Sequence, residues 1–355
     1  MALDKVTVGV LADNAVTTSK VADDAVTGAK IENNPTVAGN LTVAGNTTLS
    51  GTSTLTGNAT ASGNLTVTGD VIPSTPLSHR NLIINGGMQI AQRQTSLSLS
   101  GGGLNGYWTC DRYGVSHSNV DNLVLTQEKS TVSPDGFSSS LKHTVTTAES
   151  AIADDEYFRI YQSLEGQDLQ QLAYGSSGAK TFTLSFWVRS SVTGTYGVTC
   201  YQYDGSLQQT HNYTITTADT WQKIELPFTG NTANAIANDN TDGLKFLWYL
   251  LVGNNFKGTA STTWSAYSGA KSAGLATAVW GTSTSHNFYL TGVQMEIGSS
   301  ATPFEHRSYG DELLRCQRYF TRNGAMFFNH ITGNNAITNW HPTVPMRYRP
   351  SVSIK

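Results

Sequence analysis

A glycine recurs at six-residue intervals from Gly39 to Gly69, and this spacing constrains the fold more than any other feature of the chain. The blocks read GNLTVA, GNTTLS, GTSTLT, GNATAS and GNLTVT, and their third and fifth residues tend to be apolar or small. Alternation with a period of two indicates β-strand, and the glycine lets the backbone bend once per block. A strip this thin cannot build a core alone, so it buries its apolar side chains only against copies of itself.

Two arrangements satisfy that requirement. A single left-handed β-helix would use about three such blocks per coil, so this segment would form only about two coils. Three parallel chains wound around one axis would bury the apolar residues of every block. We favour this homotrimeric β-shaft over residues 39–72. Its predicted axial residues are Leu41, Val43, Leu49, Leu55, Leu65 and Val67.

A different repeat precedes the shaft. Residues 1–30 read as three decads, MALDKVTVGV, LADNAVTTSK and VADDAVTGAK, in which Val6, Val16 and Val26 are aligned. The Asp and Asn positions are typical of turns, and the Val-Thr pairs are typical of short strands. A segment this short and free of bulky aromatics cannot fold alone. We expect residues 1–38 to order by trimerising or by docking onto a larger structure, the alternative being a disordered leader.

Composition narrows the class of protein. Charged residues make up 13% of the chain, against about 25% in ordinary globular domains. The net charge of −3 gives no reason to expect nucleic-acid binding, and no apolar run is long enough to predict insertion into a membrane. The three cysteines, Cys110, Cys200 and Cys316, are not spaced like a zinc site. They predict buried thiols in a chain made in a reducing compartment.

The chain changes character after a linker at residues 73–80. Residues 81–307 are rich in aromatics and contain strand-like runs separated by turn residues. Clear examples are Asn81–Ala91, Asn122–Glu128, Thr181–Arg189, Gly197–Tyr203, Gln222–Phe228, Leu244–Val252 and Asn287–Met295. Helical patterns are confined to Glu165–Leu172 and Tyr309–Phe320. The sequence therefore predicts an all-β chain, a trimeric shaft followed by a jelly-roll β-sandwich head, with a short helix in the C-terminal segment 308–355.

Five segments of this region carry a resemblance to a known family. They are NLIINGGMQIAQR, GYWTCDRY, FTLSFWVRSS, TWQKIELPF and FYLTGVQMEIGSSATPFEHRSYGDELLRCQRYF. These segments closely resemble the distal domains of bacteriophage tail fibre proteins, and the decads resemble the N-terminal regions of such fibres. Residues 181–297 are similar to the jelly-roll carbohydrate-binding modules of glycoside hydrolases. In related fibres a further strand-rich region follows CQRYF, so the segment 308–355 is either a short tip or truncated.

The resemblance implies a component of the phage virion made in the host cytoplasm. Its N-terminus would attach to the tail or another virion protein, and its head would bind a host-surface glycan or lipopolysaccharide. Two alternatives remain open. One is a structural fibre whose receptor contact is made elsewhere, and the other is a polysaccharide depolymerase.

Glycan binding requires exposed aromatic faces beside polar groups. The polar loop from Asn254 to His286 carries several aromatics, and a strand ahead of it carries two more. The predicted glycan-binding residues are Phe256, Trp264, Tyr267, Trp280, Tyr201 and Tyr203. His211 and Tyr213 extend the second group. The alternative for Trp264 and Trp280 is that they pin the loop onto the sandwich.

The sequence gives only weak signals for catalysis and for metal binding. Depolymerases use paired carboxylates, and the candidates are Asp154, Asp155 and Glu156, and Glu296 with Glu305. Such acids also occur in solvated turns and in ion pairs, so we expect no enzymatic activity. The run NDNTDG at 238–243 resembles half of a calcium loop. No cofactor is predicted, although structural calcium stays open.

Overall fold

The computed structural model describes residues 78–322 without a break, together with short stretches within 40–66 and 329–348. The chain divides into one unit of residues 1–71 and a second of residues 72–355. Nearly all the residues predicted for attachment and for the shaft axis lie outside the described part. The exception is Val43, which is exposed.

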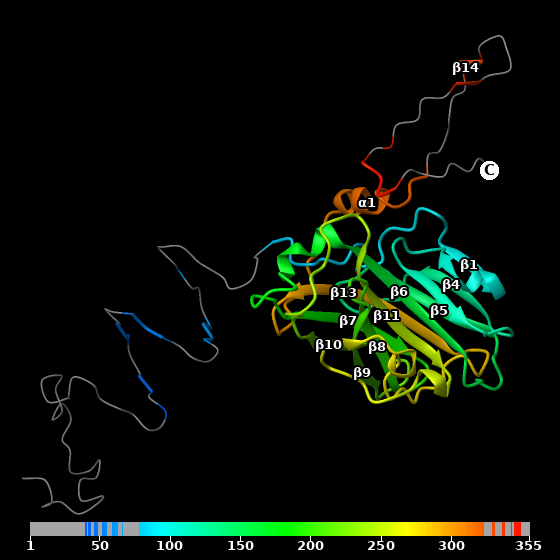
Figure 1. Cartoon of the computed structure of the whole chain (residues 1–355), viewed down its shortest axis with the longest axis horizontal. Helices are drawn as coiled ribbons and strands as arrows, with labels where there is room; N and C mark the ends of the chain where they lie inside the picture. Colours follow the sequence, from blue (N-terminus) through cyan, green and yellow to red (C-terminus); the bar gives the residue numbers. More distant parts are fainter. Residues whose placement is uncertain are drawn as a thin grey trace, which may run out of the picture. The chain divides into compact units, whose positions relative to one another are not determined.

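The second unit is a sandwich of two antiparallel sheets (Figure 1). The six-stranded sheet has the order β1 (Ser96–Ser100), β4 (Val124–Ser130), β5 (Ser140–Thr147), β13 (Asn287–Ile297), β7 (Phe182–Ser190) and β10 (Gln222–Phe228). The seven-stranded sheet has the order β12 (Ser265–Ala266), β9 (Leu207–Ile215), β8 (Gly194–Gln202), β11 (Asp242–Val252), β6 (Tyr157–Glu165), β3 (Gly114–Ser118) and β2 (Gly106–Tyr107). The chain crosses repeatedly from one sheet to the other. The predicted jelly-roll class of fold is confirmed.

Helical structure is short. The 3-10 helices are η3 (Gly101–Leu104), η4 (Gly166–Leu172), η5 (Asn254–Phe256) and η6 (Gly269–Lys271). The α-helix α1 (Tyr309–Gln317) lies outside the sheets at one end of the sandwich (Figure 1), and Ser308 caps it by accepting from the Asp311 N–H at 3.2 Å. A two-stranded ribbon, β14 (Asn329–His330) and β15 (Ala336–Ile337), follows. Within the described residues, no helix is long and apolar enough to cross a lipid bilayer.

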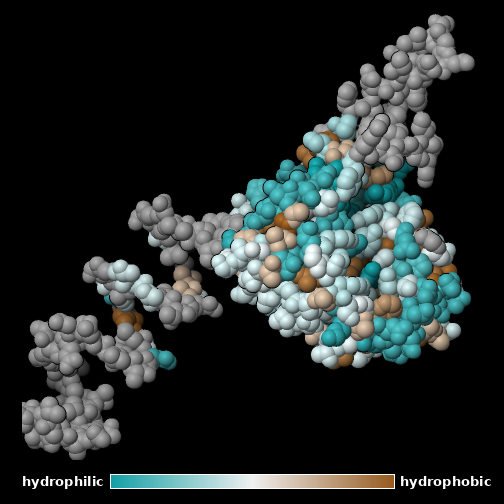
Figure 2. Space-filling model, viewed as in Figure 1, coloured by the Kyte–Doolittle hydropathy of each residue, from teal (hydrophilic) through white to brown (hydrophobic). Residues whose placement is uncertain are grey.

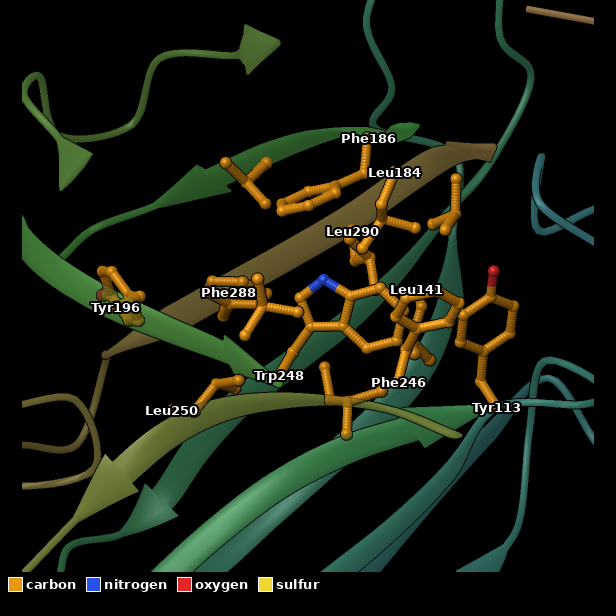
Figure 3. Packing of buried hydrophobic residues seen from close by; sticks show 14 of the residues in the cluster. Tyr113, Leu141, Leu184, Phe186, Tyr196, Phe246, Trp248, Leu250, Phe288 and Leu290 are labelled. Atoms are coloured by element: carbon orange, nitrogen blue, oxygen red, sulfur yellow. The ribbon is translucent and has the colours of Figure 1, made fainter. Parts of the chain in front are cut away.

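Aromatic side chains from the two sheets form the core (Figure 3). Trp248 of β11 is fully buried and meets Phe186 of β7 edge to face, with ring centroids 5.9 Å apart. Phe246 of β11 meets Phe182 of β7 in the same way at 5.9 Å. Both strands supply alternate residues to the interior, as the sequence predicts. All three cysteines are buried free thiols, as expected.

One predicted strand is wrong. Asn81–Ala91 contains no strand, because side chains take up several of its backbone groups and only Leu82 and Gly86 form backbone hydrogen bonds with β13. The Asn81 side chain accepts from the Ile83 N–H at 2.9 Å, and that of Asn85 accepts from the Ile90 N–H at 2.9 Å. Asn85 itself has a φ of 60°, in the left-handed region that breaks a strand. The alternating apolar residues therefore belong to a buried turn.

That turn is joined to the end of the sandwich. The Glu305 carboxylate accepts from the Asn81 N–H at 2.9 Å, and Arg307 donates to the carbonyls of Asn81 and Ile83. Arg307 also pairs with Glu312 of α1 at 3.4 Å. These contacts fix the first and last segments of the sandwich to each other. They give Glu305 and Arg307 a structural role.

Candidate functional site

The outer face of the seven-stranded sheet is set by the alternation of its central strands. In β11, Phe246 and Trp248 point into the core, while Lys245 and Tyr249 lie on the opposite face. The register places Lys245 directly opposite Tyr201 of β8. The outward side chains of adjacent strands therefore form rows that cross the sheet.

One such row is almost entirely aromatic, and we call it the tyrosine row. Its members are Tyr107, Tyr161, Lys245, Tyr203, Tyr201 and Tyr267. Tyr107 and Tyr161 meet edge to face at 5.3 Å. The Lys245 ammonium lies 4.3 Å from the centre of the Tyr161 ring and donates to the Tyr203 hydroxyl at 3.1 Å. Tyr201 then contacts Tyr203 at 4.9 Å and Tyr267 at 5.1 Å, again edge to face.

A glycine makes room for the row. Gly114 of β3 lies directly opposite Tyr161 of β6. A Cβ atom at Gly114 would lie 2.3 Å from the Tyr161 ring, closer than any real contact. The absence of a side chain at Gly114 therefore lets the Tyr161 ring lie over β3 and reach Tyr107 on β2.

The row is open to solvent at its Tyr203 and Tyr267 end. Tyr203 is 38% exposed and Tyr267 is 43% exposed, whereas the other members are half-buried. Burial raises the pKa of Tyr161 and of Tyr203 above the ordinary value. Both hydroxyls therefore keep their protons at neutral pH and can donate as well as accept hydrogen bonds.

A groove of about 460 Å³ adjoins the row at Tyr203. Its lining residues are Tyr203, Asp204, Thr241, Asp242, Arg347 and Tyr348. Arg347 pairs with Asp242 at 2.6 Å and lies over the ring of Tyr348 at 4.9 Å. The groove therefore offers aromatic faces, a hydroxyl and carboxylates next to the tyrosines.

The other half of the outer face is covered. The loop after β11 folds back over it, and the predicted site residue Phe256 packs edge to face on Tyr157 at 4.9 Å. Arg159 lies over the Tyr157 ring at 4.4 Å and donates to the Tyr249 hydroxyl at 2.5 Å. The loop approaches so closely that a Cβ atom on Gly197 would meet the Ala273 carbonyl at 2.2 Å. Phe256 therefore helps to hold the loop rather than facing open solvent.

The prediction for Trp280 is wrong. Trp280 is fully buried and stacks on Phe158 with ring centroids 5.8 Å apart, so neither face of the indole is free. Trp264 is half-buried, donates to the Thr229 carbonyl at 2.7 Å and packs on Tyr174. Both tryptophans pin the loop, which was the alternative. Sugar contact by Trp264 stays a prediction.

The structure also groups the predicted glycan-binding aromatics differently from the sequence prediction. Tyr267, expected with the tryptophans, joins Tyr201 and Tyr203 in one cluster. His211 and Tyr213 were expected beside them, but both point into the core. His211 packs on Phe228 at 4.4 Å, and Tyr213 is 5% exposed.

Three members of the row were not predicted. Tyr161 lies in YFRIYQSLE, whose first residues alternate between the two faces, and Lys245 is a charged residue in the mainly apolar β11. Tyr107 belongs to a two-residue strand. The alternation in β6 and the charge in β11 could have indicated the first two. No pattern in the sequence could have indicated that Tyr107 lies beside Tyr161.

Each carboxylate named above as a catalytic candidate accepts a hydrogen bond from another group of the protein. Asp154 accepts from Asn254, and Asp155 from Asn119, both at 2.7 Å. The other three do the same locally: Glu156 accepts from the Ala153 N–H, Glu296 from Thr302 and Glu305 from the Asn81 N–H. Each of these five carboxylates therefore has a hydrogen-bond donor within the protein.

The Asn- and Asp-rich run at 238–243 forms a turn in which side chains are paired within the protein. Asp239 accepts from the Thr241 N–H at 2.8 Å, and Asp242 pairs with Arg347. Within the described residues, no group of three or more His, Cys, Asp or Glu side chains is arranged to hold a metal ion.

Comparisons with known proteins add the following. No family model and no curated protein matches the sequence. Among solved structures, the head is similar to the enzymatically active domain of tailspike protein 4 of bacteriophage CBA120, at 10% identity and a TM-score of 0.33, over 61% of this chain and 21% of that one. It is similar to the carbohydrate-binding module TmCBM61 in complex with β-1,4-galactotriose, at 8% identity and a TM-score of 0.29, over 62% of this chain and 99% of that one. A family 11 carbohydrate-binding module from Clostridium thermocellum matches at 12% identity and a TM-score of 0.29, over 54% of this chain and 91% of that one.

Proposed function

We propose that this protein is a homotrimeric tail fibre of a bacteriophage virion whose head binds a host-surface glycan along the tyrosine row. The row is the observation that carries the proposal. The mechanism is binding without catalysis. The N-terminal decads attach to the tail or another virion protein, and the hexapeptide shaft holds the head away from it.

The row has the chemistry that sugar binding requires. Aromatic faces accept the C–H surfaces of pyranose rings, and fixed polar groups beside them accept or donate to the hydroxyls. Tyr203 and Tyr267 supply the accessible rings. The Tyr203 hydroxyl, Lys245 and Asp204 supply polar groups in the same place.

The dimensions of the row favour an extended ligand. It crosses the seven-stranded sheet from β2 to β12. Its five steps between neighbouring side chains measure 4.3 to 5.8 Å each, so the row is about 25 Å long at most. This length suits several consecutive sugars better than a single one. The face of the molecule shown in Figure 2 is mainly polar among the described residues, with apolar side chains scattered over it in small groups.

Trimerisation would multiply a modest affinity. Three heads on one shaft place three rows near the same surface, and the second and third contacts become effectively intramolecular. The gain in avidity can reach about 10²–10⁴-fold without any new contact in the head.

Binding to cells tests the proposal. Labelled full-length fibre is titrated onto bacteria before and after periodate oxidation of their surface glycans. We expect saturable binding that is lost on oxidation. Saturable binding that survives oxidation would point to a protein receptor and would contradict the proposed ligand class. The absence of binding across a panel of bacteria would favour the structural fibre, and release of reducing ends would favour the depolymerase.

A further inference from the structure

The environment of Lys245 is unusual for an outward-facing lysine. Its ammonium lies over the Tyr161 ring at 4.3 Å, 5.8 Å from the centre of the Tyr203 ring, and donates to the Tyr203 hydroxyl at 3.1 Å. The side chain is half-buried in the middle of the tyrosine row. In the described part of the chain, no carboxylate lies within 4.0 Å of it.

The two acids of the adjoining groove are engaged elsewhere. Asp242 pairs with Arg347 at 2.6 Å, and Asp204 accepts from the Ala237 N–H at 3.0 Å. The Asp242 carboxylate neutralises Arg347. Lys245 is therefore a cation of the row that has no ion-pair partner among the described residues.

We propose that the tyrosine row recognises an acidic glycan, with one carboxylate or phosphate group of the sugar seated on Lys245 between Tyr161 and Tyr203. This inference rests on the proposed function, because it names the class of ligand for the same site.

The physical argument is that a partly buried ammonium is unfavourable until it is paired. Burial removes water from the charge, and the aromatic rings offset only part of that loss. Burial accordingly lowers the pKa of Lys245, although Asp242 opposes the shift. A bound anion restores the missing interaction and forms a charge-assisted hydrogen bond.

The surroundings of Lys245 also limit the number of acidic groups that the bound glycan can carry. Asp204 lies in the adjoining groove, where it accepts from a backbone N–H and has no cationic partner among the described residues, so it would repel a second anionic group. Aromatic rings flank Lys245 on both sides and favour uncharged sugar faces. The preferred ligand therefore carries isolated acidic groups between neutral sugars rather than a continuous polyanion.

The test compares one polysaccharide in three forms. Surface polysaccharide is purified from a bacterium that the fibre binds and is used native, after carboxyl reduction and after dephosphorylation. Full-length fibre is titrated with each form at low and at high salt. We expect one of the two treatments to weaken binding at least ten-fold, which identifies the acidic group. We also expect binding of the native form to weaken as salt rises.

Three variants assign the effect to Lys245. Lys245→Gln should weaken binding of the native form as much as removal of the acidic group does, and should add little when that group is already absent. Lys245→Arg should keep most of the binding. Lys180→Gln, at an exposed lysine after η4, should change nothing.

The outcomes separate the two levels of the proposal. Equal binding of all three forms, with salt-independent affinity, would overturn the acidic ligand and leave glycan binding intact. No binding of the native polysaccharide would overturn both.

Discussion

Arg318 donates two hydrogen bonds to Glu165, from Nε at 2.8 Å and from Nη2 at 2.6 Å. The Glu165 side chain is fully buried at the end of β6, whereas that of Arg318 is 27% exposed. Burial alone would raise the pKa of Glu165, but the hydrogen bonds from Arg318 and Tyr319 and the nearby positive charges outweigh it, so the pKa lies below its ordinary value. This pair ties the segment after α1 to the same sheet that carries the tyrosine row.

Removing Arg318 should therefore destabilise the head. Arg318→Gln leaves the Glu165 carboxylate buried with one charged partner fewer. We expect the free energy of unfolding to fall by about 3 kcal/mol, the lower part of the range for broken buried pairs, because Arg318 is partly exposed. Urea unfolding at fixed protein concentration measures the change. Arg315→Gln is the control, since Arg315 lies on α1 and takes part in no ion pair among the described residues. Equal effects of the two substitutions would contradict the assignment.

The space that Gly114 leaves for Tyr161 can be tested by filling it. Gly114→Ala places a Cβ atom 2.3 Å from the ring and must displace it. We expect a loss of about 1–3 kcal/mol in the free energy of unfolding, typical of overpacking, together with weaker glycan binding.

The double variant Gly114→Ala with Tyr161→Ala provides the check. Once the ring is gone, the added methyl group has room, so the two losses of stability should sum to more than the double variant shows. Strict additivity would show that the ring does not lie over Gly114.

Two buried histidines should make the free energy of unfolding depend on pH. Burial lowers the pKa of His143 to about 3 and that of His211 to about 4, from an ordinary 6.5. Because the folded pKa values are depressed, the unfolded chain binds protons first as the pH falls below 6.5. The contribution of these histidines to the free energy of unfolding is therefore complete above pH 6.5. It is lost as the pH falls from 6.5 to the folded pKa values of about 3 and about 4. Each histidine contributes a slope of up to about 1.4 kcal/mol per pH unit.

Unfolding in urea at pH 7, 6 and 5 measures that slope. His143 lies beside the neutral Gln127 side chain. His143→Gln should remove the contribution of His143 to the slope, even if the substitution also changes the free energy of unfolding at pH 7. An unchanged slope in the His143 variant would contradict the prediction.

The oligomeric state is a separate prediction. The hexapeptide blocks bury their apolar residues only between chains, so the full-length protein should sediment at three times its chain mass of 38.1 kDa. Replacing Leu41, Leu55 and Leu65 together with Ser should shift it toward the single-chain mass. A monomeric native protein would contradict the shaft and the avidity that depends on it.

Six of the seven runs predicted as strands overlap strands of the sandwich. TFTLSFWVR gives β7, and QKIELPF coincides with β10. The pattern failed at 81–91, where side-chain hydrogen bonds of Asn81 and Asn85 hold a turn instead of a strand. Propensity cannot reveal such local competition, because the competing side chains act only once the turn has formed.

The site was harder to predict for a different reason. An aromatic residue in a polar loop can either face solvent or anchor the loop, and Trp280 anchors it. The row itself depends on which strands become neighbours, and Tyr107, Tyr161 and Tyr201 come from strands that are distant in the sequence. Sequence gives the face of each strand, whereas only the strand order brings these faces together.

The most direct test of the central claim removes the exposed end of the tyrosine row. Full-length fibre carrying Tyr203→Ala and Tyr267→Ala is titrated with surface polysaccharide by calorimetry, beside Tyr309→Ala, which removes a still more exposed tyrosine from α1. Thermal unfolding confirms that each variant is folded. We predict that the double variant binds at least ten-fold more weakly and that the Tyr309 variant binds like the native protein. Unchanged affinity in a folded double variant would contradict binding along the row.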